Sequence, residues 1–324
     1  DPNLLVGRVR GKNFTHLSRD PLKPLFNRAT QAAYPSGSTF KLVNALVGLQ
    51  TGAITQQSRF SCSGKASVPI ACSHSHYSPL ELIGAIEQSC NPYFWAVFRQ
   101  TLDKAGKGNI HKGYNIWRNH VMSMGFGDYY DNDIPNHSRG NIPSDRFYDR
   151  IYGNNGWKAM TIRSLSIGQG EILVTPVQLA NQAAVIANRG FYYPPHVVKS
   201  INGVPTRWPK KQSTISPAHF ETVIEGMYEV FQGVSGTARW YKLEGIPACG
   251  KTGTVQNPHG KDHSLFIAFA PADKPVIAIA VVVENSGFGA TWAVPMASLM
   301  IEQYITGEIK RKDLEERMTQ ANLL

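Results

Sequence analysis

The apolar positions of the first hundred residues follow a helical period. Between residues 38 and 50 they recur at helical spacing directly after the turn-forming residues 34–37, which predicts a helix that starts near residue 38. Residues 79–99 are also largely apolar, but the polar run at 89–92 interrupts them. The proline in that run predicts a break or a fresh helix start.

The last third of the chain changes to a strand pattern. Apolar runs at residues 265–270 and 276–283 flank the turn residues 271–275, which predicts a hairpin of two buried antiparallel strands. Residues 248–255 predict a third strand beside them, and residues 293–306 a helix that covers one face of the sheet. Together these elements predict an α+β fold.

The other segments are predicted to be less regular, apart from a helix that opens at Thr175-Pro176 and ends near residue 188. Residues 1–36 are rich in Pro, Asn and Arg and predict an extended lead-in, and residues 58–78 predict a polar loop. Residues 103–160 are rich in Gly, Asn and Asp, and we expect a surface excursion that covers part of a cleft. No internal repeat is evident.

Composition limits the possible classes of function. The 324 residues, 42% hydrophobic and 17% charged, describe a globular chain large enough for a large core or two domains. The formal charge of +10 suits an anionic partner, but the lysines and arginines are scattered along the chain, so we expect no nucleic-acid binding. The longest aliphatic run, residues 276–283, falls well short of the ~20 residues of a membrane span.

Ser38 and Lys41 form the first chemical signal. Residues three apart on a helix share a face, so the Lys41 amine would lie beside the Ser38 hydroxyl and be able to take its proton. Free backbone N–H groups at the helix start would favour a nearby oxyanion. Alone, the pattern is also explained by a capping serine followed by a solvated lysine.

Two further motifs change that interpretation. Ser89-Cys90-Asn91 and Lys251-Thr252-Gly253 follow Ser38-Thr39-Phe40-Lys41 in the order of the penicillin-recognising serine acyltransferases. The chain resembles the transpeptidase domain of class B penicillin-binding proteins, and more closely the elongation-type penicillin-binding protein 2. The similarity extends over residues 34–41, 89–94, 168–171, 175–180 and 283–285.

The resemblance implies a fold and a domain organisation. The expected fold is that of the penicillin-binding protein transpeptidases and serine β-lactamases, with a central antiparallel sheet covered by helices. Residues 1–324 would form the transpeptidase domain. The resemblance places a membrane anchor, a pedestal domain and the first sheet strands outside this chain.

The resemblance also implies catalytic roles. Ser38 would attack the carbonyl of a D-Ala-D-Ala peptide and form an acyl-enzyme. Lys41 would be its base, with a pKa depressed by burial beside a second cation such as Lys251. Ser89 would relay a proton to the leaving amine, and Asn91 would hold the amide of the donor peptide.

The third motif would bind the substrate. Lys251, Thr252 and Thr254 would hold the terminal carboxylate, and Gly253 would let the substrate approach the strand closely. Backbone N–H groups of Ser38 and Thr254 would form the oxyanion hole.

The implied activity is a peptidoglycan D,D-transpeptidase that cross-links stem peptides during elongation and is acylated by β-lactams. The resemblance places it at the periplasmic face of the inner membrane, with a membrane glycosyltransferase of the shape, elongation, division and sporulation family as partner. The alternatives are a β-lactam sensor domain and a serine β-lactamase or D,D-carboxypeptidase. Because Glu171 follows a Gly-Gln-Gly turn shared by the synthases, we interpret it as structural and expect slow deacylation by water.

The cysteines predict a metal site. Cys62, Cys72 and Cys90, with His76, are typical ligands of a tetrahedral Cys₃His zinc site. Some penicillin-binding protein 2 members carry zinc in this segment, with a ligand at the middle of the second motif, and the resemblance implies a structural zinc here. His74 is the other candidate for the histidine ligand.

Two alternatives to zinc stay open at this point. Cys62 and Cys72 could form a disulfide, or the thiols could be buried and unpaired. Cys249, on the predicted strand ahead of Lys251, is expected to be a small core residue.

Overall fold

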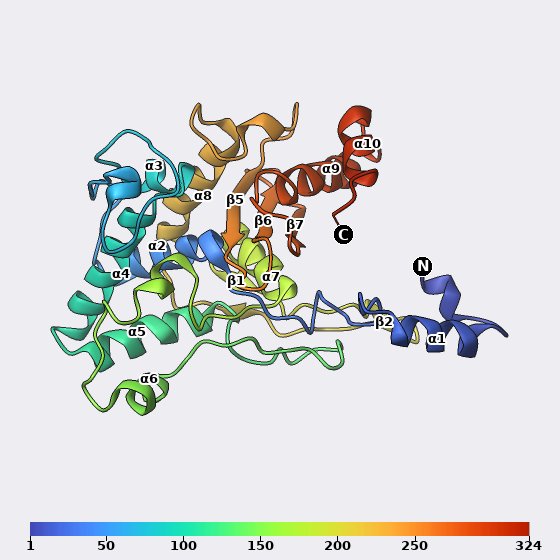
Figure 1. The fold of residues 1–324 in the computed structure, drawn as a ribbon, viewed down its shortest axis with the longest axis horizontal. Coiled ribbons are helices and arrows are strands. Elements are labelled where there is room, and N and C mark those ends of the chain that lie inside the picture. The colour runs from blue at the N-terminus through green and yellow to red at the C-terminus, as the bar shows by residue number, and fades with distance from the viewer. Residues whose placement is uncertain (324) are drawn as a thin grey trace.

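A three-stranded antiparallel sheet lies at the centre of the computed structural model, which describes residues 1–323 (Figure 1). Its strands are β5 (Cys249–Val255), β6 (His263–Ala270) and β7 (Ile277–Val283), in that spatial order. The central strand β6 is buried from Ser264 onwards, because neighbours cover both its edges and helices its faces. The predicted hairpin and the third strand beside it are therefore confirmed.

Three helices pack on this sheet. Helix α7 (Pro176–Ala187) and helix α9 (Ala293–Thr306) contact β6 and β7, and helix α8 (Ala218–Gln232) contacts β5. Helix α7 begins at a capping box in which Thr175 and Gln178 exchange side-chain and backbone hydrogen bonds. These contacts bear out the predicted helices at residues 175–188 and 293–306.

A second group of helices lies to one side of the sheet (Figure 1). The helix predicted from residue 38 starts as a 3-10 turn, η2 (Gly37–Phe40), and continues as α2 (Lys41–Gln50). The polar interruption in residues 79–99 separates α3 (Leu82–Glu87) from α4 (Asn91–Gly106), as its proline predicts. Two residues of this interruption, Ser89 and Asn91, contact Lys41 at the start of α2.

The prediction of an irregular excursion over residues 103–160 is wrong for two segments. Helix α5 (Ile110–Ser123) and helix α6 (Asp145–Tyr152) lie there, and Tyr114, Trp117 and Val121 of α5 are fully buried. These residues recur at helical spacing, but polar neighbours conceal that spacing in the composition. Packing of α5 on α4 thus decides the local structure.

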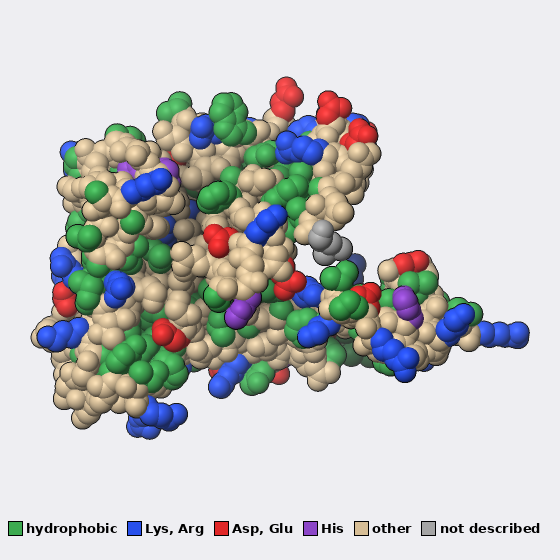
Figure 2. Space-filling view, viewed as in Figure 1, with side chains coloured by type: hydrophobic (Ala, Val, Ile, Leu, Met, Phe, Trp, Pro, Cys, Tyr) green, Lys and Arg blue, Asp and Glu red, His purple; other side chains and the backbone are tan. Residues whose placement is uncertain are grey.

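The prediction of an extended lead-in is also wrong in part. Residues 2–5 form η1 (Pro2–Leu5) and residues 10–19 form α1 (Arg10–Arg19), and neither contains a buried residue. Both lie on an arm that projects from the body, where Figure 2 shows several Lys and Arg side chains.

The remaining elements are short or peripheral. They are η3 (Gly64–Ala66), η4 (Arg163–Ile167), β1 (Phe191–Tyr192), β2 (Ser200–Ile201), β3 (Val204–Pro205), β4 (Lys211–Gln212), η5 (Arg239–Tyr241) and α10 (Lys312–Thr319). Among the described residues, the longest apolar helices are all too short or too polar to cross a bilayer.

Candidate active site

Ser38 lies in the 3-10 turn η2, on the wall of a cleft of about 930 Å³. Two neighbours shape this turn. The hydroxyl of Thr39 donates a hydrogen bond to the carbonyl of Ser36 at 2.7 Å. Gly37 has φ of +54°, and a Cβ there would lie 2.9 Å from the carbonyl oxygen of Thr254. Glycine at this position therefore lets the turn approach strand β5 closely.

Lys41 is fully buried at the start of α2. Its Nζ donates to the carbonyl of Ser89 at 2.7 Å, to the Ser89 hydroxyl at 3.1 Å and to Oδ1 of Asn91 at 2.6 Å. Burial lowers the pKa of Lys41 to about 8, and the electrostatic effect of the nearby Cys72 and Cys90 opposes this shift. The structure therefore brings the first two motifs into direct contact.

Ser89 and Asn91 are placed by the backbone between α3 and α4. Ser89 has φ of +56°, a left-handed conformation that is uncommon for serine. Asn91 is the first residue of α4, and its Nδ2 donates to the carbonyl of Ala71 at 2.8 Å. The amide of Asn91 thus joins Lys41 to the loop that ends near residue 76.

The third motif lies on β5, across the cleft from the second. Thr252, Gly253 and Thr254 line the cleft together with Ser38. A Cβ at Gly253 would lie 3.0 Å from Leu265 and 3.1 Å from the Thr39 methyl, so a side chain there would crowd η2. The strand can approach η2 because this position is glycine.

Lys251 is fully buried, and its Nζ donates to the carbonyl of Thr252 at 3.2 Å. Burial, and then the positive charge of Lys41, hold the pKa of Lys251 well below its usual range. The sequence predicted that burial and the charge of Lys251 together lower the pKa of Lys41. In the structure burial alone lowers the pKa of Lys41, and the repulsion between the two lysines lowers the pKa of Lys251.

Thr237 is a cleft residue that the sequence analysis missed. Its hydroxyl lies 2.9 Å from the hydroxyl of Thr252, and it lines the cleft. The loop that carries it is held by Glu87, whose Oε1 accepts from the backbone N–H of Ser235 at 3.0 Å. Nothing in the spacing of residues 235–237 marks this position, because the contact joins segments far apart in the chain.

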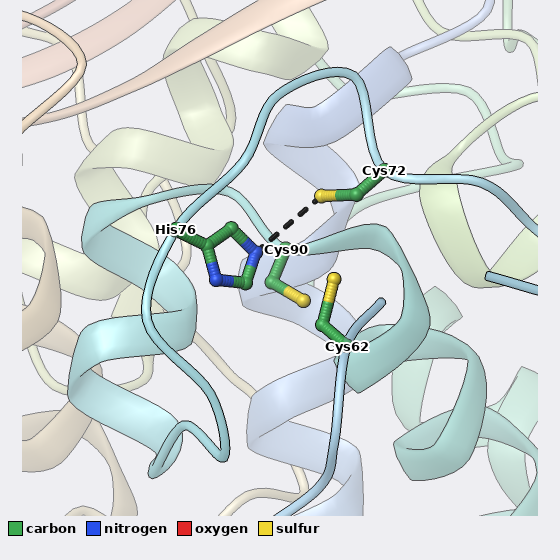
Figure 3. Close-up of side chains that lie close together, drawn as sticks. All are labelled: Cys62, Cys72, His76 and Cys90. Atoms are coloured by element: carbon green, nitrogen blue, oxygen red, sulfur yellow. Dashed lines mark hydrogen bonds between the residues drawn. The ribbon is translucent and has the colours of Figure 1, made fainter. Parts of the chain in front are cut away.

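A cluster of three thiols and one imidazole lies behind the second motif (Figure 3). The potential ligand atoms of Cys62, Cys72, His76 and Cys90 all lie within 4.8 Å of one another. Nε2 of His76 is 3.5 Å from the Cys72 sulfur, while its Nδ1 is 2.8 Å from the carbonyl of Tyr77. This carbonyl favours a proton on Nδ1, which leaves the lone pair of Nε2 directed at the cluster.

His74 lies outside this cluster and lines the cleft instead, with its Nδ1 3.1 Å from the Ser73 hydroxyl. All four cysteines are free thiols, so the disulfide alternative is wrong. Hydrogen bonds, first from the Cys90 thiol, hold the pKa of Cys72 well below its usual range. Cys249 is fully buried in the core.

Residues 1–302 match the family described as the penicillin binding protein transpeptidase domain. The chain belongs to this family. It is 33% identical to the peptidoglycan D,D-transpeptidase MrdA of Acinetobacter baumannii over 90% of its own length. The chain spans only 46% of that relative.

Solved structures agree with this assignment. Pseudomonas aeruginosa PBP2, in complex with WCK 5153, matches the whole chain and 69% of its own length, with 30% identity and a TM-score of 0.78. A second solved structure is described as a peptidoglycan synthase complex that coordinates polymerization and crosslinking. The match covers 95% of this chain and 52% of the chain in that structure, with 27% identity and a TM-score of 0.82. The predicted fold and the resemblance to elongation-type penicillin-binding protein 2 are confirmed.

The Glu87 carboxyl yields a stability prediction. Burial raises the pKa of Glu87, so the folded state favours the protonated carboxyl more than the unfolded state does. The contribution of this carboxyl to folding stability is therefore lost as pH rises through its pKa in the folded state. Glu87→Gln keeps an oxygen for the Ser235 N–H and removes the buried charge. We expect the variant to melt at a higher temperature than the parent at pH 8 and to lose this advantage toward pH 4.

The matched control is Glu225→Gln on the exposed face of α8. Thermal melts across this pH range should show little difference between that variant and the parent. A Glu87→Gln variant that is less stable than the parent at pH 8 would contradict the assignment of a desolvation cost to Glu87.

Proposed function

We propose that this chain is the catalytic domain of an elongation-type peptidoglycan D,D-transpeptidase. The observation that carries the proposal is the buried Lys41 amine, which is hydrogen-bonded to Ser89 and Asn91 beside the cleft that Ser38 lines. Strand β5 supplies the opposite wall. The family match and the MrdA relative support the same reaction.

Acylation would begin when the neutral amine of Lys41 takes the proton of Ser38. With a pKa of about 8, roughly a tenth of Lys41 is neutral at pH 7. The Ser38 oxygen then bonds to the carbonyl carbon of the penultimate D-Ala, and the bond to the terminal D-Ala breaks. The leaving amine receives a proton from the Ser89 hydroxyl, and Ser89 recovers one from the Lys41 ammonium to which it is hydrogen-bonded, so that Lys41 is neutral again.

Deacylation would repeat these steps in reverse with an acceptor amine as the nucleophile. The amine attacks the ester carbon, the Ser38 oxygen leaves, and the proton released by the amine returns to Ser38 through Ser89 and Lys41. The product is a new peptide bond between two stem peptides. The β-lactam amide would react with Ser38 in the same way but keep its leaving group tethered.

The substrate carboxylate would bind at β5. Thr252 and Thr254 line the cleft, and Thr237 adds a hydroxyl 2.9 Å from that of Thr252. Lys251 is fully buried, with its Nζ on the carbonyl of Thr252. Backbone N–H groups of Ser38 and Thr254 would stabilise the oxyanion. One such donor is typically worth about 3 kcal/mol of transition-state stabilisation.

A β-lactamase is disfavoured by the position of Glu171. This carboxylate lies outside the residues that line the cleft, and its Oε2 accepts a hydrogen bond from the hydroxyl of buried Tyr148 at 3.1 Å. A water-activating base would have to reach the acyl-enzyme at Ser38. The position of Glu171 therefore favours a long-lived acyl-enzyme, which a transpeptidase needs and a β-lactamase avoids.

A structural zinc ion would be held by Cys62, Cys72, His76 and Cys90. Three thiols and an imidazole suit tetrahedral Zn²⁺, and the spread of the ligand atoms is close to what such a site requires. Thiolates, where carboxylate-ligated relatives would have oxygens, should bind the ion more tightly. The ion would tie the loop over residues 62–76 to the start of α4.

The remaining expectations concern the whole protein. The full-length enzyme would act at the periplasmic face of the inner membrane, held by an anchor outside residues 1–324. Its partner would be a membrane glycosyltransferase of the shape, elongation, division and sporulation family. The structural similarity to a peptidoglycan synthase complex supports this pairing.

Covalent labelling tests the nucleophile. A fluorescent penicillin should label the protein in a one-to-one ratio, and Ser38→Ala should abolish labelling because no other hydroxyl occupies that position. Ser164→Ala is the control, since Ser164 lines the same cleft outside the three motifs. Labelling of the Ser38→Ala protein would refute the assignment, and release of the label within seconds would refute the synthase interpretation.

The pH dependence of acylation tests the base. Since only neutral Lys41 can accept a proton, the second-order rate of acylation by a penicillin should rise about tenfold per pH unit below the pKa of about 8 and level off above it. Stopped-flow measurements between pH 5.5 and pH 9.5 would show the profile, with thermal melts to confirm that the protein stays folded. A rate independent of pH would exclude Lys41 as the base.

Elemental analysis tests the metal. The purified protein should carry about one equivalent of zinc, Cys72→Ser should lose most of it, and Cys249→Ser should retain it because Cys249 lies outside the cluster. Removal of the metal by a chelator should lower the melting temperature of the parent protein. Less than about a tenth of an equivalent of any metal in the parent would end the proposal.

A further inference from the structure

A second cavity, of about 270 Å³, lies among the ends of α5 and α6 and the loop that joins them. None of the residues that line it also lines the active-site cleft. Its lining includes Arg118 of α5, Arg139 of the loop and Arg150 of α6, together with Ser144 and Phe147. No step of the transpeptidase reaction proposed above uses these residues.

The charge of this cavity is one-sided. Three arginines line it, and no aspartate or glutamate does. In the described part of the chain, none of the three arginines forms an ion pair. Like charges that share one cavity repel each other, so the arrangement becomes favourable when an anion lies between them.

Arg118 is held in place by its Nε, which donates to the carbonyls of Ile142 at 3.1 Å and Pro143 at 2.8 Å. Its two terminal nitrogens have no hydrogen-bond acceptor among the described residues. The guanidinium is therefore oriented by the backbone while most of its donors remain available. This is the preorganisation that an anion site requires.

The two carboxylates of α6 are committed elsewhere. Asp145 accepts from Asn115 at 2.7 Å, and Asp149 accepts from the Trp157 indole at 2.8 Å. Both also lie 3.6 Å from the ring of His111. They therefore serve the other face of α6 and form no ion pair with the arginines of the cavity.

We propose that this cavity binds a phosphate group. Three guanidiniums offer more donors than the two oxygens of a carboxylate can accept, whereas a phosphate presents at least three charged or polar oxygens. The Ser144 hydroxyl, which makes no capping bond to α6, supplies a further donor. The volume accommodates a phosphate with a small substituent.

Isothermal titration of the whole chain with inorganic phosphate and with glycerol 3-phosphate, in about 0.15 M chloride to screen loose surface binding, tests the proposal. The variant Arg139→Gln/Arg150→Gln should lose affinity for both by about tenfold or more. The control Arg8→Gln/Arg207→Gln removes the same charge from two exposed arginines outside the cavity and should change affinity less than about twofold. Equal melting temperatures confirm that each variant folds.

Vesicles of phosphatidylglycerol, with phosphatidylcholine vesicles as reference, identify the source of the phosphate. Sedimentation with the anionic vesicles that depends on Arg139 and Arg150 assigns a lipid headgroup, and binding of the small phosphates alone assigns a free ligand. Three results would overturn the proposal: no heat of binding with either phosphate, equal losses in the two double variants, or tighter binding of acetate than of phosphate. None of these readouts depends on transpeptidase activity.

Discussion

The burial of the Lys41 amine is the constraint on which the rest of the site depends. In the described chain no carboxylate pairs with it, and its three acceptors are the Ser89 carbonyl, the Ser89 hydroxyl and Asn91 Oδ1. Three acceptors match the three donors of an ammonium group, whereas a neutral amine has two donors and a lone pair. Deprotonation therefore frees one acceptor and exposes the lone pair, and burial, which lowers the pKa of Lys41 to about 8, makes the neutral amine accessible near neutral pH.

The second motif serves two sites because of its backbone. Cys90 is the N-cap residue of α4 in an extended conformation, with φ of −66° and ψ of 117°, and its side chain makes no capping hydrogen bond. Ser89 and Asn91 reach Lys41, while Cys90 joins the cysteine cluster (Figure 3). Contacts with Lys41 and with the cysteine cluster thus hold Ser89 at its left-handed φ. They offset the cost of this conformation, which is of order 1 kcal/mol.

The sequence is most predictive where apolar runs are long and uninterrupted. The hairpin over residues 263–283 and the helix over residues 293–306 follow from such runs, and the three motifs could be found because each is local. Helix α5 was missed because its buried face lies among polar residues. Thr237 could not be predicted, because its place depends on a hydrogen bond to Thr252 that only the tertiary fold creates.

Glu87 shows how the fold joins the two walls of the cleft. It lies two residues before Ser89, and it holds the N–H of Ser235, two residues before Thr237. Close packing fixes this contact, since a Cβ at Gly233 would lie 2.2 Å from Glu87 Oε1. A displacement of α3 would therefore move Ser89 on one wall and Thr237 on the other together. Ser89, the proposed proton relay, and Thr237, a proposed ligand of the substrate carboxylate, therefore keep their spacing through the contact of one buried side chain.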